Sequence, residues 1–187
     1  MPNTFYINYF GPIDNKTTNV IMGTCANIIS QNKPDCLYFL FASGGGSVDA
    51  GISLYNFLKS LPATIVMHNT GTIDSIATVI FLAGNERYAA SHSSFLFHGV
   101  SMGFKQGTAL NLSQMNERKS QLENDQNKIA GIISDNTDIT QDEMLKLFIQ
   151  GETKGLDFAQ EKGIIHGIKD PQIPKDAPLV SININSK

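Results

Sequence analysis

The sequence predicts an α/β fold with right-handed crossovers and a mainly parallel sheet. Three observations lead to this class. Short apolar runs alternate with segments of helical spacing through the first half of the chain. One run, from Cys36 to Ala42, is apolar throughout, as expected of a strand that is covered on both faces. Turns that contain glycine follow two of the runs, at Gly44 and at Gly71.

The elements of the first half have clear boundaries. Thr4 to Phe10 alternates aromatic or β-branched residues with polar ones, which predicts a half-buried strand. Helical spacing then continues until Asn32-Lys33-Pro34-Asp35 breaks it, and Pro62 ends the next helical segment. The expected elements are strands at 4–10, 36–42, 64–67, 87–90 and 94–97, with helices at 16–31, 48–61 and 73–82.

The second half predicts mainly helices. A long polar segment carries only a thin apolar stripe, which predicts a helix that projects from the main body. Thr140, with Glu143 three residues later, has the pattern of a capping box. The expected elements are helices at 109–135, 141–148 and 156–162 and a short strand at 164–165. The tail from Pro171 contains three prolines and is expected to be irregular, and no repeat or linker divides the single domain predicted over residues 1–187.

Composition and charge exclude several classes of function. The 187 residues carry a formal net charge of −3, and the lysines and arginines are scattered, so neither nucleic acid nor an anionic membrane is expected as a partner. Cys25 and Cys36 lack the spacing of a zinc site or a disulfide framework, so we expect buried reduced thiols, no metal and no cofactor. No apolar run could span a membrane and no leader pattern follows Met1, which predicts a cytoplasmic protein.

The first glycine-rich turn, Gly44-Gly45-Gly46-Ser47, joins a buried strand to a helix. Its backbone N–H groups are expected at the edge where open α/β sheets bind their ligands. The turn could be a plain connection, a phosphate cradle or one half of an oxyanion hole. It lacks the lysine of a P-loop and the spacing of the dinucleotide fingerprint, which argues against nucleotide binding.

The second turn, from Gly71 to Ala77, places Ser75 where a buried strand meets an apolar helix. A serine at this position suits a nucleophile, because nearby N–H groups favour developing negative charge. A purely structural alternative is that Ser75 or Asp74 caps the helix.

His98 ends an apolar strand-like run and precedes Gly99, so it is expected beside the turn that carries Ser75. A serine hydroxyl needs a base within hydrogen-bond reach, and histidine is the usual one. The remaining histidines are weaker candidates because of their places in the pattern, namely His68, His92 and His166.

These motifs together resemble the proteolytic subunit of the Clp protease. The resemblance rests on Gly45-Gly46-Ser47-Val48-Asp49-Ala50-Gly51, on Gly71 to Ile76 and on Phe97-His98, in that order. It continues with Gln106-Gly107-Thr108-Ala109 and with Ala159 to Ile165, and covers roughly residues 4–170.

The resemblance implies a fold and an activity. The fold would be a crotonase-like head of superhelical βαβ units with a projecting handle helix at about 109–135. The activity would be serine-type hydrolysis of peptides or unfolded proteins in the chamber of a ring-like homo-oligomer. Ser75 would attack the scissile carbonyl, His98 would accept its proton, and the N–H groups of Gly45 and Ile76 would form the oxyanion hole.

The sequence departs from the family pattern at three places. An ungapped count back from Ala159 puts Gly151 where the family supplies a catalytic aspartate, so the adjacent Glu152 becomes the predicted third catalytic residue. Asp135 and Asp157 are further out of register. Asp74 places a carboxylate beside the nucleophile, and we expect it to cap the helix. The family's N-terminal axial loop is missing, which argues against an ATP-driven unfoldase as partner and against a seven-membered ring.

Two alternatives to a peptidase remain open. Gly151 and Asp74 are compatible with a catalytically impaired homologue that acts as a scaffold or as the silent partner of an active subunit. An acyl-CoA hydratase or isomerase of the crotonase type would share the fold, but those enzymes work through carboxylates rather than a Ser–His pair. A membrane-bound signal-peptide peptidase with a lysine base is disfavoured, because His98 fills the position of the base.

Overall fold

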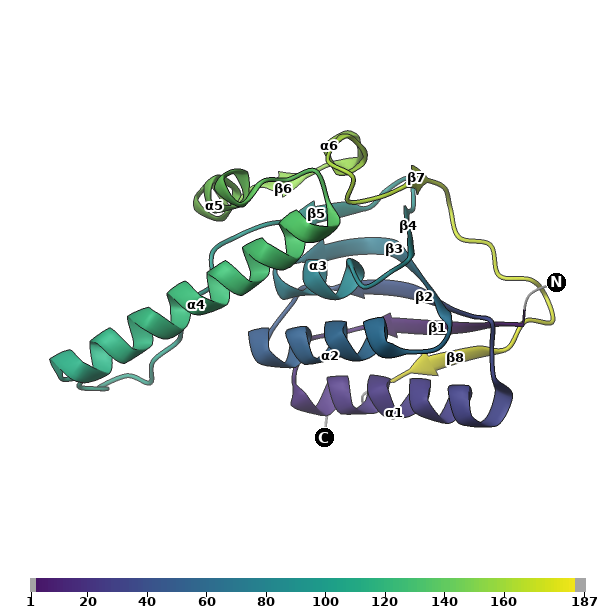
Figure 1. The fold of residues 1–187 in the computed structure, drawn as a ribbon, viewed down its shortest axis with the longest axis horizontal. Coiled ribbons are helices and arrows are strands. Elements are labelled where there is room, and N and C mark those ends of the chain that lie inside the picture. The colour runs from purple at the N-terminus through teal and green to yellow at the C-terminus, as the bar shows by residue number, and fades with distance from the viewer. Residues whose placement is uncertain (1–2, 184–187) are drawn as a thin grey trace.

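A mostly parallel sheet forms the centre of the fold in the computed structural model, which describes residues 3–183 (Figure 1). The strand order is β6-β5-β3-β2-β1-β8. Strand β4 pairs with β3, and β7 pairs with β4. The pair β5–β6 is antiparallel. The predicted α/β class is confirmed. The strands are β1 (Thr4–Phe10), β2 (Cys36–Ser43), β3 (Thr64–Asp74), β4 (Glu86–Ala89), β5 (Ser94–Leu96), β6 (Thr153–Lys154), β7 (Gly167–Ile168) and β8 (Leu179–Ile182).

Six helices of the described residues cover and extend this sheet. Helices α1, α2 and α3 lie side by side against it, and α4 projects from the body, as the polar character of its sequence predicts (Figure 1). The helices are α1 (Asn15–Asn32), α2 (Val48–Ser60), α3 (Ile76–Phe81), α4 (Leu112–Asn136), α5 (Gln141–Gln150) and α6 (Leu156–Glu161). The single domain predicted over 1–187 extends outside the described residues at both ends.

The sheet branches along β3, its longest strand. The first part of β3 pairs with β4 through Val66–Asn69, and the last part pairs with β5 through Thr72–Asp74. Strands β2, β3 and β5 run parallel, so their carboxyl ends lie at one edge of the sheet. This edge is the usual ligand-binding position in open α/β folds.

Arg87 ties the end of the sheet to the helices around it. Its side chain is buried, and its guanidinium donates to the carbonyl oxygens of Gly84, Asn136, Gly163 and Ile164. Five N–H donors in a rigid fork suit this arrangement, because the four acceptors belong to three separate segments. The end of α4 and the turn after α6 are thereby held against the strands.

The beginning of α5 is fixed by a capping box and an ion pair. Thr140 accepts a hydrogen bond from the N–H of Glu143, whose carboxylate accepts one from the N–H of Thr140. The same carboxylate lies 2.9 Å from Nζ of Lys162. The backbone hydrogen bond from Thr140 and the bond from Lys162 lower the pKa of Glu143 to about 2.

Five expectations from the sequence differ from the structure. The third strand continues to Asp74, so the helix after it starts at Ile76 and not near residue 73, and Asp74 is not its cap. The strand expected at 164–165 is a buried connection, and a strand lies instead at 167–168. The tail expected to be irregular contains β8, which adds to β1 in parallel. These pairings depend on distant partners, which a local pattern does not reveal.

We expect Glu143→Gln to lower the melting temperature by a few degrees at pH 7. The pKa of Glu143 is lowered by folding, so its contribution is complete above its ordinary value of 4.5 and is lost as the pH falls through about 2. Thermal unfolding from pH 7 to pH 2 checks this. Asp142→Asn is the control, because it removes an exposed charge from the same turn; an equal loss in both variants at pH 7 would contradict the prediction.

Candidate active site

Three chain segments meet at the carboxyl edge of the sheet. A Cβ placed on Gly45, in the turn after β2, would lie 2.8 Å from Cβ of Ser75, so the two backbones are in close contact. The N–H of Ser75 donates to the carbonyl oxygen of Leu96, the last residue of β5, at 2.8 Å. The structure therefore brings the glycine turn, Ser75 and the segment before His98 together.

Ser75 occupies a strained turn between β3 and α3. Its φ of 57° and ψ of −131° lie outside the regions that a side chain favours. A sharp strand-to-helix turn of this kind is how α/β hydrolases expose a nucleophilic serine. The Ser75 hydroxyl makes no capping hydrogen bond, so the predicted structural alternative for this residue does not hold.

Ser75 and His98 line the same recess. The other walls are apolar and include residues of α4 and α5, and the recess holds about 10 Å³, which is room for roughly one water molecule. Nδ1 of His98 lies 2.9 Å from the carbonyl oxygen of Gly99. No hydrogen bond joins the Ser75 hydroxyl to the ring among residues 3–183, as is common in a site without substrate.

The predicted oxyanion-hole groups are unequal. The N–H of Gly45 donates to Oγ of Ser43 at 3.1 Å. The N–H of Ile76, at the first position of α3, makes no hydrogen bond within the described residues. An oxyanion at this site would therefore compete with the Ser43 hydroxyl for Gly45.

Two carboxylates are candidates for the partner of His98, Glu152 from the sequence and Asp74 from the fold. Glu152 is 64% exposed in its side chain, and its carboxylate is 2.9 Å from Nζ of Lys154. Asp74 is half-buried at the end of β3. Burial raises the pKa of Asp74, while the charge of His98 and the Leu96 backbone N–H act in the opposite direction. The structure thus places Asp74, which we expected only to cap a helix, within electrostatic reach of the histidine.

Gly151 ends α5 in the left-handed conformation, with φ of 60°. Its N–H donates to the carbonyl oxygen of Leu147, which closes the last turn of the helix. The antiparallel pairs of β5 and β6 end at Leu96–Thr153, and His98 and Gly151 each lie two residues beyond that last pair. A glycine offers the histidine no side chain from this place in the chain.

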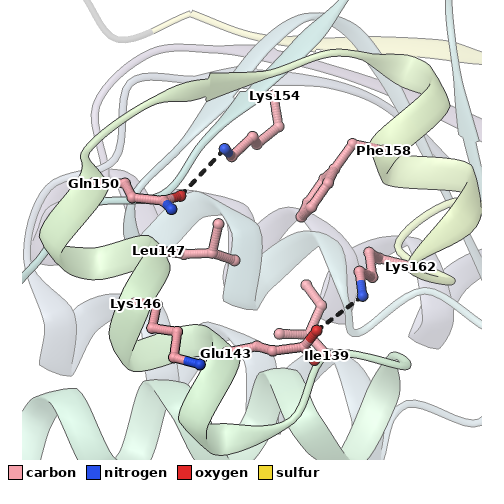
Figure 2. A pocket seen from close by; sticks show the side chains of 8 residues that line it. All are labelled: Ile139, Glu143, Lys146, Leu147, Gln150, Lys154, Phe158 and Lys162. Carbon is pink, nitrogen blue, oxygen red and sulfur yellow. Dashed lines mark hydrogen bonds and ion pairs between the residues drawn. The ribbon is translucent and has the colours of Figure 1, made fainter.

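A separate pocket of about 270 Å³ lies over α5, β6 and α6, away from Ser75 (Figure 2). Figure 2 shows Lys154 reaching toward Gln150 and Lys162 toward Glu143, around Leu147 and Phe158. The lining residues are Ile139, Glu143, Lys146, Leu147, Gln150, Lys154, Phe158 and Lys162. Lys154 thus lines this pocket, and its ammonium group also forms the ion pair with the Glu152 carboxylate.

The other histidines have structural partners or lie on the surface. His68 is buried, and its Nε2 donates to the carbonyl oxygen of Lys169 while Nδ1 accepts from the hydroxyl of Tyr38. The ring nitrogen Nδ1 of His166 accepts from the backbone N–H of Arg87, and His92 is exposed.

The described residues show neither a membrane helix nor a metal cluster. None of their helices is long and apolar enough to cross a membrane, and no group of three His, Cys, Asp or Glu could hold a metal ion there. Cys25 and Cys36 are free thiols, the first buried and the second half-buried, and burial raises the pKa of Cys25 to about 12.

Sequence comparison identifies the family of this chain. The family model described as Clp protease matches residues 1–172. The chain belongs to the Clp protease family. Two members of the Clp protease family, both named ATP-dependent Clp protease proteolytic subunit, are similar to it. The protein from Streptococcus mutans is 31% identical over 132 residues, and that from Bigelowiella natans is 32% identical over 91 residues.

These alignments cover 68% and 48% of this chain and 65% and 47% of the relatives, so the chain spans less than two thirds of either relative. Membership of the Clp protease family, which the motifs around Gly45, Ser75 and His98 suggested, is confirmed.

We expect Gly45→Ala to destabilise the fold by about 1–3 kcal/mol, because the new Cβ would enter a site with positive φ. That Cβ would also lie 2.8 Å from the carbonyl oxygen of Asp74 and from Cβ of Ser75. Gly44→Ala is the matched control, since its Cβ would meet nothing within 4 Å. Denaturant unfolding of both variants measures the difference, and equal midpoints would show that the contact between Gly45 and Ser75 is not constrained.

Proposed function

We propose that this protein is a serine-type endopeptidase in which Ser75 is the nucleophile and His98 the general base. One observation supports the proposal above the others. An uncapped serine on a strained strand-to-helix turn shares a recess with a histidine, in a chain of the Clp protease family. A nucleophile and a base within one recess are what acyl transfer requires.

The reaction would follow the usual two stages of acyl transfer. The Ser75 oxygen attacks the scissile carbonyl carbon while Nε2 of His98 takes the hydroxyl proton, and that proton then passes to the leaving amine. The N–H groups of Gly45 and Ile76 would hold the oxyanion, once the Gly45 N–H exchanges the Ser43 hydroxyl for it. Water then attacks the acyl carbon, His98 accepts its proton and returns it to Ser75, and the peptide acid leaves.

The third catalytic position has two candidates, Glu152 from the sequence and Asp74 from the fold. The Ser75–His98 pair alone does not choose between them. A carboxylate in this role stabilises the imidazolium that forms during attack, so its removal lowers the rate without abolishing hydrolysis.

The substrate and the assembly belong to the same proposal. Peptides or unfolded segments are the proposed substrates, on the strength of the family. We extend the proposal to a homo-oligomeric, ring-like chamber in the cytoplasm, on the strength of the family. Short peptides need no unfolding, so their hydrolysis is expected without an ATPase.

A catalytically impaired scaffold is the second candidate function. Among the described residues, the His98 ring is bonded by a backbone carbonyl and by no carboxylate, and Gly151, at the position where the family supplies an aspartate, has no side chain. Labelling with a fluorophosphonate distinguishes the two candidates, because only an activated Ser75 reacts under native conditions.

We expect Ser75→Ala to abolish hydrolysis of short fluorogenic peptides, with a loss of at least about a thousandfold in kcat/KM relative to the wild type. No ATPase is added to the assay. Ser101→Ala, an exposed serine on the segment after His98, serves as the control and is expected to keep full activity.

The same assay with Glu152→Gln tests the third position predicted from the sequence. Loss of activity in both Ser75→Ala and Glu152→Gln would support a Ser75–His98–Glu152 triad. Loss in Ser75→Ala alone would leave a different third member. No activity and no labelling of the wild type would favour the scaffold.

A further inference from the structure

We propose that Asp74 and the backbone carbonyl of Gly99 together perform the role of the triad carboxylate for His98. The carbonyl fixes the tautomer and orientation of the ring, and Asp74 supplies the negative charge that stabilises the imidazolium. The inference rests on the proposed peptidase function and names Asp74 as a positioning residue that acts through His98.

The contact with Gly99 determines which nitrogen of His98 carries the proton. A carbonyl oxygen can only accept, so the 2.9 Å contact with Nδ1 is a hydrogen bond only when Nδ1 is protonated. Nε2 then keeps its lone pair, which is the form that a general base needs. The N–H of Gly99 donates to the carbonyl oxygen of Phe148 at 3.1 Å, so α5 anchors the residue that carries this carbonyl.

The pairing of β3 with β5 places Asp74 on the same face of the sheet as His98. Asp74 pairs with Leu96, and directly paired residues of parallel strands share a face. Burial alternates along the next residues, with Phe97 buried and His98 half-buried, so His98 returns to the face of Leu96. Asp74 and His98 therefore lie on the same side of the sheet, with His98 two residues beyond the strand partner of Asp74.

The surroundings of Asp74 strengthen its effect on the histidine. Burial raises the pKa of the carboxyl, and the charge of His98 acts against that rise, so the two groups interact electrostatically. A half-buried pair is screened less by water and salt than an exposed one. The backbone of Asp74 is also fixed, since its carbonyl oxygen contacts Gly45 and the next N–H is bonded to Leu96.

The side chain of Glu152 is engaged elsewhere. It is 64% exposed, and its carboxylate lies 2.9 Å from Nζ of Lys154. Lys154 lines the separate pocket over α5, β6 and α6 and not the recess that holds Ser75 and His98. Of the two acidic residues, Asp74 alone is half-buried and has no competing ion pair within the described residues.

Peptide hydrolysis by Asp74→Asn is the first test. We expect kcat to fall about tenfold to a hundredfold with little change in KM, because the stabilised charge exists only in the transition state. Glu152→Gln is expected to lose less than about threefold, as is Asp157→Asn, an exposed acidic control on α6. Burial raises the pKa of Asp74 on folding, so the charged form costs stability at pH 7, and Asp74→Asn is expected to keep or raise the melting temperature.

A rescue variant separates charge supply from a structural effect. Gly151→Asp in the Asp74→Asn background would place a carboxylate at the end of α5, at the position where the family supplies its aspartate. A Cβ at Gly151 meets nothing within 4 Å, and aspartate is among the residues that tolerate its positive φ. We expect the double variant to recover at least about half of the loss in log kcat that Asp74→Asn causes.

Nitrogen-15 NMR of the His98 ring tests the proposal without relying on activity. We expect the pattern of a ring protonated at Nδ1, and ring signals that move in Asp74→Asn and stay in place in Glu152→Gln. A ring protonated at Nε2, or signals that move only in Glu152→Gln, would overturn the proposal whether or not the protein hydrolyses peptides. Hydrolysis that depends on Ser75 but is unaffected by Asp74→Asn would overturn it while leaving the peptidase function intact.

Discussion

The close contact between Gly45 and the backbone of Ser75 is the constraint on which the site depends. Ser75 has a positive φ, which costs of order 1–3 kcal/mol and persists only where the surroundings compensate. Here the N–H of Ser75 is bonded to Leu96, its carbonyl accepts from Thr78, and all six residues of α3 are buried. A side chain at position 45 would prevent this packing, so the glycine turn after β2 and the serine turn after β3 form one structural unit.

This edge of the sheet could be anticipated from the sequence because it follows from a simple rule. Strands with glycine turns at their carboxyl ends, arranged in parallel, bring those turns together, and the meeting of Gly45, Ser75 and His98 follows. The extent of β3 did not follow, since Gly71 and Thr72 have the character of a turn, and the pairing of Thr72–Asp74 with β5 is not visible in a local pattern. Strand β8 was not predicted for the same reason, because the short segment after Pro178 is a strand only through its parallel pairing with β1.

The third catalytic position shows the limit of arguing from sequence distance. Glu152 is the nearest acidic residue to the expected position along the chain, yet its exposed carboxylate binds Lys154. Asp74 is far from that position in sequence, but the pairing of β3 with β5 brings it beside the segment that leads to His98. The signal that could have found it was present in the alternation of residues 94–98, provided that the pairing with β3 was known.

Helix α5 links access to the site with the orientation of the base. Its residue Phe148 lines the recess that holds Ser75 and His98, and the carbonyl of the same residue accepts from Gly99. A substrate group that entered this recess of about 10 Å³ would have to displace Phe148 or another of the lining residues. A shift of the Phe148 backbone would also move the backbone of Gly99, whose carbonyl holds Nδ1 of His98. Opening the site and aligning its base are therefore not independent: a movement confined to the Phe148 side chain would widen the recess and leave His98 in place, whereas a movement of the whole helix would release the ring.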